Sequence, residues 1–473
     1  MTTETSVKQL PDGDAVFLST ETDTAWGHVG GMSILDPTGV PDFSYEKLLR
    51  QIGQRLVHVP RFRWKLLEVP FGLDRPYWVE VPDFDVRKHV HRIAVPAPGG
   101  MKELGELAGH LFARPLDRSR PLWEFWYIEG LADGKVAMFM KNHHCLMDGQ
   151  AGVGLAEVMT DLSPDATAPP IVPDVMKEGM PVAPSAIQIA AQAARNILGR
   201  QVKRVEHVGR GLRAVASPLW QKRDEFAPPS WSDVPPLSFN KLVGMRRSFA
   251  CASLDLEELK TIKKHFDVTL NDVVLEVIGG ALRRWLRAKG ELPERPLVAM
   301  CPVSLRAEGD QSLSNQITMM PVSLATDLGD PADRLRRIAK NSARSKESVQ
   351  GSFDVLAAVS ESLAPGLVGL LMRAMAIAPD SIPLPGNLIV SNVRGTPIPL
   401  YTAGARIESM YPMSVLQAGQ GLNATVVSYM GKMEFGFTVD PDLVPDVHEL
   451  CDQIHRSFEE LSAAAEGVVH RAA

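Results

Sequence analysis

The chain has 473 residues, of which 45% are hydrophobic and 22% charged, and this composition is typical of a globular protein rather than a fibrous or disordered one. A single hydrophobic core stops growing near roughly 250 to 300 residues, so the length predicts two domains. The net charge of −6 includes no basic surplus, which argues against nucleic acid as a partner.

The cysteines are far apart and show no CxxC spacing, so we expect a reduced compartment rather than a disulfide framework. They are Cys145, Cys251, Cys301 and Cys451. The N-terminus shows no basic region followed by an apolar core, so we expect no secretory signal and a cytoplasmic protein.

Residues 1–165 form a first block that alternates helix and strand signals. The spacing of apolar residues in "FSYEKLLRQIGQRLVH" predicts a helix over 43–58. The apolar run "GKVAMFMKNHH" predicts a strand over 134–144 that is buried on both faces. Small residues and then Leu155, Val158 and Met159 predict a helix packed on that strand.

A connector over 166–239 is predicted from a change in composition. The proline-rich stretch "SPDATAPPIVPDVMKEGMPVAP" can continue neither helix nor sheet. It leads into a probable basic helix over 185–215, which could bridge the domains with a solvated basic face or lie on an anionic membrane. A second proline cluster, "FAPPSWSDVPPLSFN", closes the connector.

The second block, 240–473, again mixes helices and strands. "TLNDVVLEVIGGALRRWLRAKG" predicts a helix capped at Asn271 or Asp272 and ending before Gly290. Buried strands are expected in "PLVAMCPVSLR" and "GNLIVSNVRG", a hairpin turning near Gly431, and a late amphipathic helix over 444–467. We therefore expect an α/β fold of two similar mixed domains around a shared cleft.

An apolar segment over 363–386 is interrupted by Arg373 and closed by prolines. A spanning helix needs about 20 apolar residues, so we expect a core or interface helix in which lipid contact is possible.

The motif "HHCLMDG" carries the clearest chemical signal. A buried strand presents His144 at its end, and an imidazole needs little pKa adjustment to accept a proton near neutral pH. Asp148 either orients the imidazole or fixes the loop through an arginine, and Gly149 gives the backbone freedom to leave the strand. The candidate arginines are Arg61, Arg63 and Arg306.

Three other readings of this motif compete with a general base. A metal site on His143, His144 and Asp148 is disfavoured because neighbouring strand residues point to opposite faces. A nucleophilic dyad of Cys145 with a histidine fails for the same reason. The remaining alternative is a polar strand end with two hydrogen-bonded histidines. We expect no metal.

"HHCLMDG" matches the HHxxxDG motif of the coenzyme A-dependent acyltransferases that resemble chloramphenicol acetyltransferase, a motif shared with peptide-synthetase condensation domains. The whole chain is similar to the bacterial wax ester synthase/diacylglycerol acyltransferase branch. The collinear stretches are "DAVFLSTETDTAWGHVGG", "DRSRPLWEFWYIEGL", "TLNDVVLEVIGGALRRWL", "PVSLR", "LSNQIT", "IVSNVRGTPIPLY" and "LNATVVSYMGKMEFGF".

The resemblance implies two acetyltransferase-like domains with a cleft or tunnel between them. It implies an O-acyltransferase that moves a long-chain acyl group from acyl-coenzyme A to diacylglycerol or a long-chain alcohol. Acyl-coenzyme A is then a co-substrate, and no bound cofactor is expected. The enzyme would work at the cytoplasmic face of a membrane or on lipid droplets. Other hydroxyl or amine acceptors, and a non-catalytic lipid-binding protein, are the alternatives.

The resemblance also implies roles for individual residues. His144 takes the acceptor proton, His143 is its neighbour, and Asp148 turns away as a structural anchor. Asn271 stabilises the oxyanion or positions substrate, or acts as a plain helix cap. The candidate substrate-binding residues are Glu21, Arg306, Asn315 and Asn392. Capping or surface exposure is the alternative for Glu21.

Two departures from the family pattern concern the acceptor. Trp26 and Gly27 replace a Pro-Met pair, and Arg394 and Thr396 replace two prolines. We expect both changes to affect the acceptor pocket or the tunnel mouth rather than proton transfer.

Overall fold

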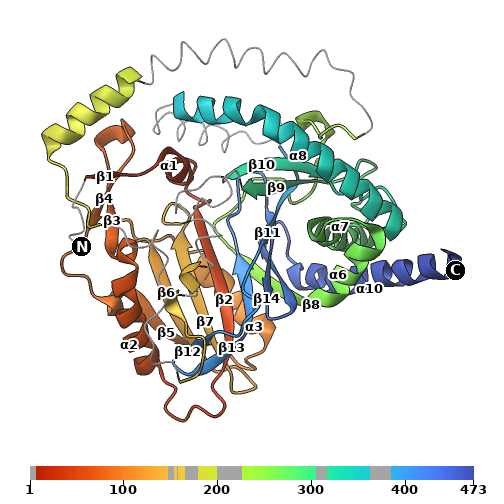
Figure 1. The fold of residues 1–473 in the computed structure, drawn as a ribbon, viewed down its shortest axis with the longest axis horizontal. Helices are drawn as coiled ribbons and strands as arrows, with labels where there is room; N and C mark the ends of the chain where they lie inside the picture. Colours follow the sequence, from red (N-terminus) through yellow and green to blue (C-terminus); the bar gives the residue numbers. More distant parts are fainter. Residues whose placement is uncertain are drawn as a thin grey trace.

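The computed structural model has a mixed α/β architecture. It describes residues 7–147, 154–156, 158–165, 179–199, 226–304, 317–362 and 385–472. Two large sheets lie next to each other, and helices α7, α8 and α10 cover the outer side of the second one (Figure 1). The predicted fold class is therefore confirmed.

The first sheet has six strands among the described residues, in the order β12-β13-β2-β7-β6-β5. β5 runs parallel to β6, and the other neighbours are antiparallel. The strands are β2 (His28–Asp36), β5 (Val90–Ala94), β6 (Trp123–Glu129), β7 (Val136–His143), β12 (Tyr401–Thr402) and β13 (Ala405–Met413). The strand predicted over 134–144 is β7, which ends at His143, one residue before the predicted end at His144.

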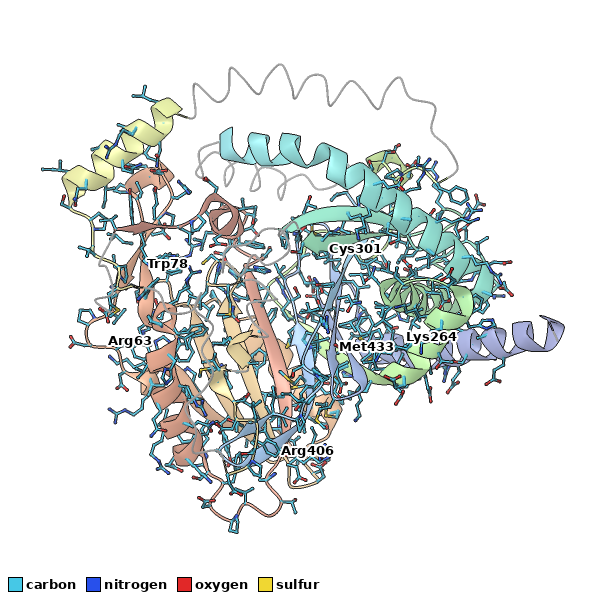
Figure 2. The ribbon with its side chains drawn as sticks, viewed as in Figure 1. Arg63, Trp78, Lys264, Cys301, Arg406 and Met433 are labelled. Carbon is cyan, nitrogen blue, oxygen red and sulfur yellow. The ribbon has the colours of Figure 1, made fainter. Side chains whose placement is uncertain are left out.

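The second sheet, counted over the same described ranges, also has six strands, in the order β10-β9-β11-β14-β15-β8. β11 lies parallel to both of its neighbours, and the remaining pairs are antiparallel. The strands are β8 (Ser248–Asp255), β9 (Val298–Ser304), β10 (Ile317–Ser323), β11 (Leu388–Val393), β14 (Leu422–Tyr429) and β15 (Lys432–Val439). Met433 and Cys301 belong to its core (Figure 2).

The two sheets do not follow the two sequence blocks. β13 comes from the second block, yet it pairs with β2 along nearly its whole length. Leu237 and Phe239, at the end of the predicted connector, lie in the core of the second sheet. The division into 1–165, 166–239 and 240–473 stays a prediction.

Helix predictions that fall on the described residues agree with the structure, apart from one cap. The helices are α1 (Asp12–Ser19), α2 (Tyr45–Arg55), α3 (Met101–Phe112), α6 (Leu256–Phe266), α7 (Leu270–Lys289), α8 (Pro331–Ser362) and α10 (Val447–Ala472). The cap predicted at Asn271 or Asp272 is wrong. Thr269 caps α7, and Asp272 completes a capping box with it. The C-terminal Gly290 adopts the left-handed conformation expected of a helix end.

The hairpin predicted near Gly431 is confirmed. β14 and β15 are joined by Met430 and Gly431, both with positive φ (46° and 78°). Positive φ at both central residues is typical of the two-residue hairpin turn, whose twist matches the right-handed twist of the flanking strands.

Shorter elements complete the first block. A small sheet has the order β1-β4-β3. Its strands and the short 3-10 helices are β1 (Lys8–Gln9), β3 (Trp64–Leu67), β4 (Tyr77–Glu80), η1 (Leu56–His58), η2 (Pro60–Arg63), η3 (Pro70–Gly72), η4 (Val86–Lys88) and, in the connector, η7 (Trp231–Asp233).

Part of the predicted connector helix is present over 186–199. Its basic continuation and most of the apolar segment over 363–386 lie outside the described residues. No helix in the described part of the chain is both long and apolar enough to cross a bilayer.

Two glycines of α3 bring the sheets together. A Cβ on Gly105 would lie 2.3 Å from the carbonyl oxygen of Phe249, and one on Gly109 would lie 2.5 Å from that of Arg247. Both carbonyls belong to the start of β8 or the residue before it. The backbone of α3 therefore packs directly on the second sheet, at a distance that only glycine permits.

Candidate active site

The two histidines of the motif have different surroundings. His143 is the last residue of β7, faces His28 across the β2–β7 pair, and is only 2% exposed. His144 is half-buried, and its N–H donates to the carbonyl oxygen of Gly27 over 2.7 Å. His144 is therefore the more exposed of the two residues, although its Nδ1 is buried.

His143 is held in one tautomer by two hydrogen bonds. The backbone N–H of Cys145 donates to Nδ1 of His143 over 3.1 Å, so Nδ1 carries no proton. The other ring nitrogen, Nε2, then donates to Oε1 of Glu21 over 3.0 Å. Both nitrogens are occupied, so the ring of His143 is held in place by its neighbours.

Glu21 is the anchor of this support. Its carboxylate also accepts the N–H of Gly27 over 2.8 Å and pairs with Arg118. Burial would raise the pKa of Glu21, but the hydrogen bond from His143 and the nearby positive charges outweigh it and lower the pKa to about 2. Glu21 is thus neither a helix cap nor a freely solvated surface acid.

His144 is covered on one face by an aromatic ring. Phe17, from α1, stacks on the imidazole with ring centroids 3.9 Å apart and planes inclined by 3°. This contact fixes the plane of the ring while the residue stays accessible. A pre-oriented imidazole at a strand end can accept a proton from a bound hydroxyl group.

Gly27 explains one departure from the family pattern. A Cβ at this position would lie 2.8 Å from Nε2 of His143, so a larger residue would displace the ring. Its neighbour Trp26 stacks near His28 and lies under the guanidinium of Arg247, 5.5 Å from the ring centroid. The replacement therefore lies directly beside the histidine pair.

The second departure lies at the end of β11. Arg394 is exposed, and Thr396 is buried and accepts the N–H of Met430 through its carbonyl oxygen. The effect of either departure on the acceptor stays a prediction.

Asn271 and Asn392 are brought together from different elements. Asn271 lies in the first turn of α7, and Asn392 lies in β11. Nδ2 of Asn392 donates to Oδ1 of Asn271 over 3.3 Å, which turns the amide nitrogen of Asn271 away from Asn392. This pair can present amide N–H donors, but its role stays a prediction.

Asp148, Gly149, Arg306 and Asn315 lie outside the described residues. Two of the arginines considered for Asp148 are described. Nη1 of Arg61 donates to the carbonyl oxygen of Leu146 over 3.1 Å, within the histidine loop. Arg63 pairs with Glu80 over 2.7 Å, on the side of the first sheet (Figure 2).

Two alternatives to a general base, a nucleophilic Cys145 and a metal site, concern the same loop. Cys145 is completely buried, and burial raises the pKa of its thiol well above the usual value. A protonated buried thiol is a poor nucleophile. In the described ranges, no three histidine, cysteine, aspartate or glutamate side chains gather as metal ligands would.

Sequence reasoning missed Phe17 and Arg118. Phe17 and Arg118 lie in two stretches quoted for the family resemblance, so their positions were visible but their contacts were not. A hollow of about 700 Å³ lies elsewhere, between α2, η1 and residues 82–87; Arg63 lines it, and neither of the two histidines does. The tunnel implied by the resemblance stays a prediction.

Comparisons with known proteins agree with this geometry. The family model for the wax ester synthase/diacylglycerol acyltransferase catalytic domain matches residues 10–274, and that for its C-terminal domain matches residues 313–462. A putative diacylglycerol O-acyltransferase of Mycobacterium tuberculosis is 35% identical over 466 residues, covering 96% of this chain and 90% of the relative. The O-acyltransferase WSD of Acinetobacter baylyi is 32% identical, covering 94% and 95%.

Solved structures share the fold. The wax ester synthase/diacylglycerol acyltransferase of Marinobacter aquaeolei has a TM-score of 0.70 at 27% identity, covering 97% of this chain and 100% of that one. The first condensation domain of the calcium-dependent antibiotic synthetase has a TM-score of 0.57 at 17% identity, and the match covers 97% of this chain and 96% of that domain. At this identity the likeness shows the fold alone. Two domain models in the expected order, with relatives matched over nearly their whole length, leave one assignment. The chain is an acyltransferase of the wax ester synthase/diacylglycerol acyltransferase family.

Proposed function

We propose that the enzyme transfers a long-chain acyl group from acyl-coenzyme A to a lipid hydroxyl group, with His144 as general base. The observation that carries the proposal is the contrast between the two histidines. His143 has both ring nitrogens engaged, whereas His144 is half-buried and oriented by Phe17. Family membership supports acyl transfer as the reaction.

The reaction proceeds by direct attack. The imidazole of His144 takes the proton of the acceptor hydroxyl while that oxygen attacks the thioester carbonyl. The tetrahedral oxyanion collapses, the C–S bond breaks, and the coenzyme A thiolate takes the proton back from the imidazolium. No acyl-enzyme forms, which fits a buried and protonated Cys145.

The oxyanion needs a hydrogen-bond donor. We assign this role to the amide of Asn271, because Asn392 holds its oxygen and the amide nitrogen can then act as the donor. Asp148 anchors the loop after the histidines in this proposal, and Glu21 acts through His143 rather than on the substrate.

The acceptor is assigned from the relatives. Their names describe diacylglycerol O-acyltransferases and a wax ester synthase, so we propose diacylglycerol, a long-chain alcohol, or both, as acceptors. Acceptors of a different kind, such as a glycolipid or an amine, are the competing assignment. A product profile by mass spectrometry over a panel of acceptors separates the two.

We place the reaction at the cytoplasmic face of a membrane or at the surface of lipid droplets, because both proposed substrates carry long acyl chains. Failure of the protein to sediment with anionic liposomes at low salt would remove this part of the proposal.

The His144 assignment is tested by substitution. With palmitoyl-coenzyme A and diacylglycerol or hexadecanol, His144→Ala is expected to release free coenzyme A more slowly by a factor on the order of 10² to 10⁴, the usual contribution of a general base. His110→Ala is the matched control, because His110 is exposed in the last turn of α3. Equal release by the His144 variant and the parent enzyme would exclude this role.

A further inference from the structure

The helix over 186–199 exposes apolar residues on the side that faces away from the protein. It contacts the first block through Asn196, whose Nδ2 donates to Asp74 over 2.6 Å and to Gln9 over 3.3 Å. Ala193, on the adjoining side of the helix, is only 6% exposed. A polar residue therefore faces the protein.

The opposite side of this helix carries an exposed apolar stripe. Ile187 is 81% exposed and Leu198 is 68% exposed. Ala191 and Ala194, also exposed, lie between them at spacings of four, three and four residues, which place all four on one helical face. Surface helices ordinarily bury such a face, so an exposed apolar stripe indicates an interaction site.

A neighbouring turn presents two further apolar side chains. Phe71, in η3, is 95% exposed and has a positive φ of 58°, which is unfavourable for a residue with a bulky side chain. Leu73 is 49% exposed, and it immediately precedes Asp74, the residue that holds Asn196. The helix lies beside β1 and β4 at one end of the molecule, so stripe and turn share a corner (Figure 1).

The charge of this corner favours an anionic surface. Arg195 is the only charged residue over 186–199, and no acid is present there. Asp74 is only 2% exposed, so its charge lies beneath the helix. An apolar helical face with a flanking cation is typical of helices that lie in the interface of an anionic membrane.

The size of the stripe argues against a second copy of the chain as its occupant. A helix of 14 residues is about 21 Å long and about 10 Å wide, which gives roughly 200 Å² of ridge. A stable protein interface needs about 800 Å² on each partner. A convex ridge of this size inserts between acyl chains more readily than it forms a dimer.

We propose that Ile187, Leu198, Phe71 and Leu73, here called the apolar corner, form the surface by which the enzyme docks on an anionic phospholipid bilayer. The stripe lies at the depth of the upper acyl chains, and Arg195 contacts the headgroups. This deepens the proposed function, since it names the surface that brings the enzyme to its lipid substrates. The contact itself does not depend on turnover.

Vesicle binding by the full-length protein tests the proposal. The probe is vesicles of phosphatidylcholine containing phosphatidylglycerol, at low salt. Ile187→Ser with Leu198→Ser is expected to lower the partition coefficient about a hundredfold, and Phe71→Ser about tenfold, since each buried side chain of this size contributes about a factor of ten. Val57→Ser is the matched control, because Val57 is 67% exposed on η1. Weak binding by the parent protein, or equal binding by all variants, would overturn the proposal.

A probe at the stripe separates lipid from other occupants. Leu198→Cys carrying an environment-sensitive dye is expected to report an apolar environment only when vesicles are added, and Val57→Cys is expected to report none. An apolar signal without vesicles that rises with protein concentration would assign the stripe to a second copy. The same signal independent of concentration would assign it to another segment of this chain.

Turnover of detergent-dispersed substrates distinguishes this proposal from the proposed function. The Ile187→Ser/Leu198→Ser variant is expected to retain that turnover while it loses vesicle binding. Vesicle binding without any acyl transfer by the parent protein would remove the proposed function and leave the docking surface intact.

Discussion

The carboxylate of Glu21 connects the electrostatics of the site to the stability of the protein. Its contacts lower its pKa to about 2 from an ordinary value of 4.5. A carboxyl whose pKa is depressed in the folded state stabilises that state above its unfolded pKa, and this contribution disappears as pH falls towards the folded pKa. The stabilisation by Glu21 is therefore complete at neutral pH and is lost between about pH 4.5 and about pH 2.

We predict that Glu21→Gln lowers the free energy of unfolding by up to about 3.4 kcal/mol at pH 7, which is the free-energy equivalent of the shift. The difference between variant and parent should shrink as pH falls below about 4.5. Denaturant titrations at a series of pH values measure it. Glu68→Gln is the control, because Glu68 contacts the same Arg118 from an exposed position. A difference that does not change with pH would contradict the assignment.

For single residues, the sequence was a better guide to the members of the candidate site than to the contacts between them. The apolar run and the motif itself were sufficient to predict a histidine pair where a buried strand ends. The partner of His143 was not predictable, because Glu21 lies 122 residues away and no local pattern links the two. Glu21 lies between α1 and β2, and it reaches His143 only because β2 pairs with β7.

The element that presents Asn271 is α7, and its start depends on a side-chain cap. Thr269 accepts the N–H of Asp272 over 3.2 Å, and Asp272 accepts the N–H of Thr269 over 2.9 Å. The sequence holds this signal as a threonine followed three residues later by an acid. The cap was misplaced because Asn and Asp are also common cap residues, and Asn271 and Asp272 lie two and three residues after Thr269.

We predict that Thr269→Ala lowers the free energy of unfolding by about 1 kcal/mol, the usual cost of removing a cap. Because Asn271 lies in the first turn, the same change should also slow coenzyme A release at saturating substrate. Thr261→Ala serves as the control, since Thr261 is an exposed mid-helix threonine in α6. If the two alanine variants unfold alike, the capping box does not stabilise α7.

At the scale of the whole molecule, the two sheets depend on each other. β13 carries residues of the second block into the first sheet. It also packs closely on the second sheet, because a Cβ added to Gly436 of β15 would lie only 1.9 Å from the carbonyl oxygen of Pro412 in β13. The sequence predicted the hairpin of β14 and β15 because a local turn specifies it. It could not predict the pairing of β13 with β2, because strands separated by most of the chain leave no local signal of their register.

The close packing of α3 on β8 can be tested by comparing two glycines that both lie within helices, Gly105 in α3 and Gly53 in α2. Alanine favours a helix over glycine by about 1 kcal/mol, so Gly→Ala within a helix stabilises a protein where space allows. Gly53, in α2, has such space, because its Cβ would lie 3.7 Å from the nearest atom, Cγ1 of Val86. Gly105 lacks it, because its Cβ would lie 2.3 Å from a backbone oxygen of β8.

We therefore predict opposite signs for the two changes. Gly53→Ala should leave the free energy of unfolding unchanged or raise it by up to about 1 kcal/mol. Gly105→Ala should lower it by about 1 to 3 kcal/mol, the usual cost of overpacking, because α3 must move away from β8. Thermal and denaturant unfolding of both variants measure the difference. A stabilising Gly105→Ala would mean that α3 does not hold the two sheets together, since a backbone contact this close cannot accept a methyl group without separating the elements that make it.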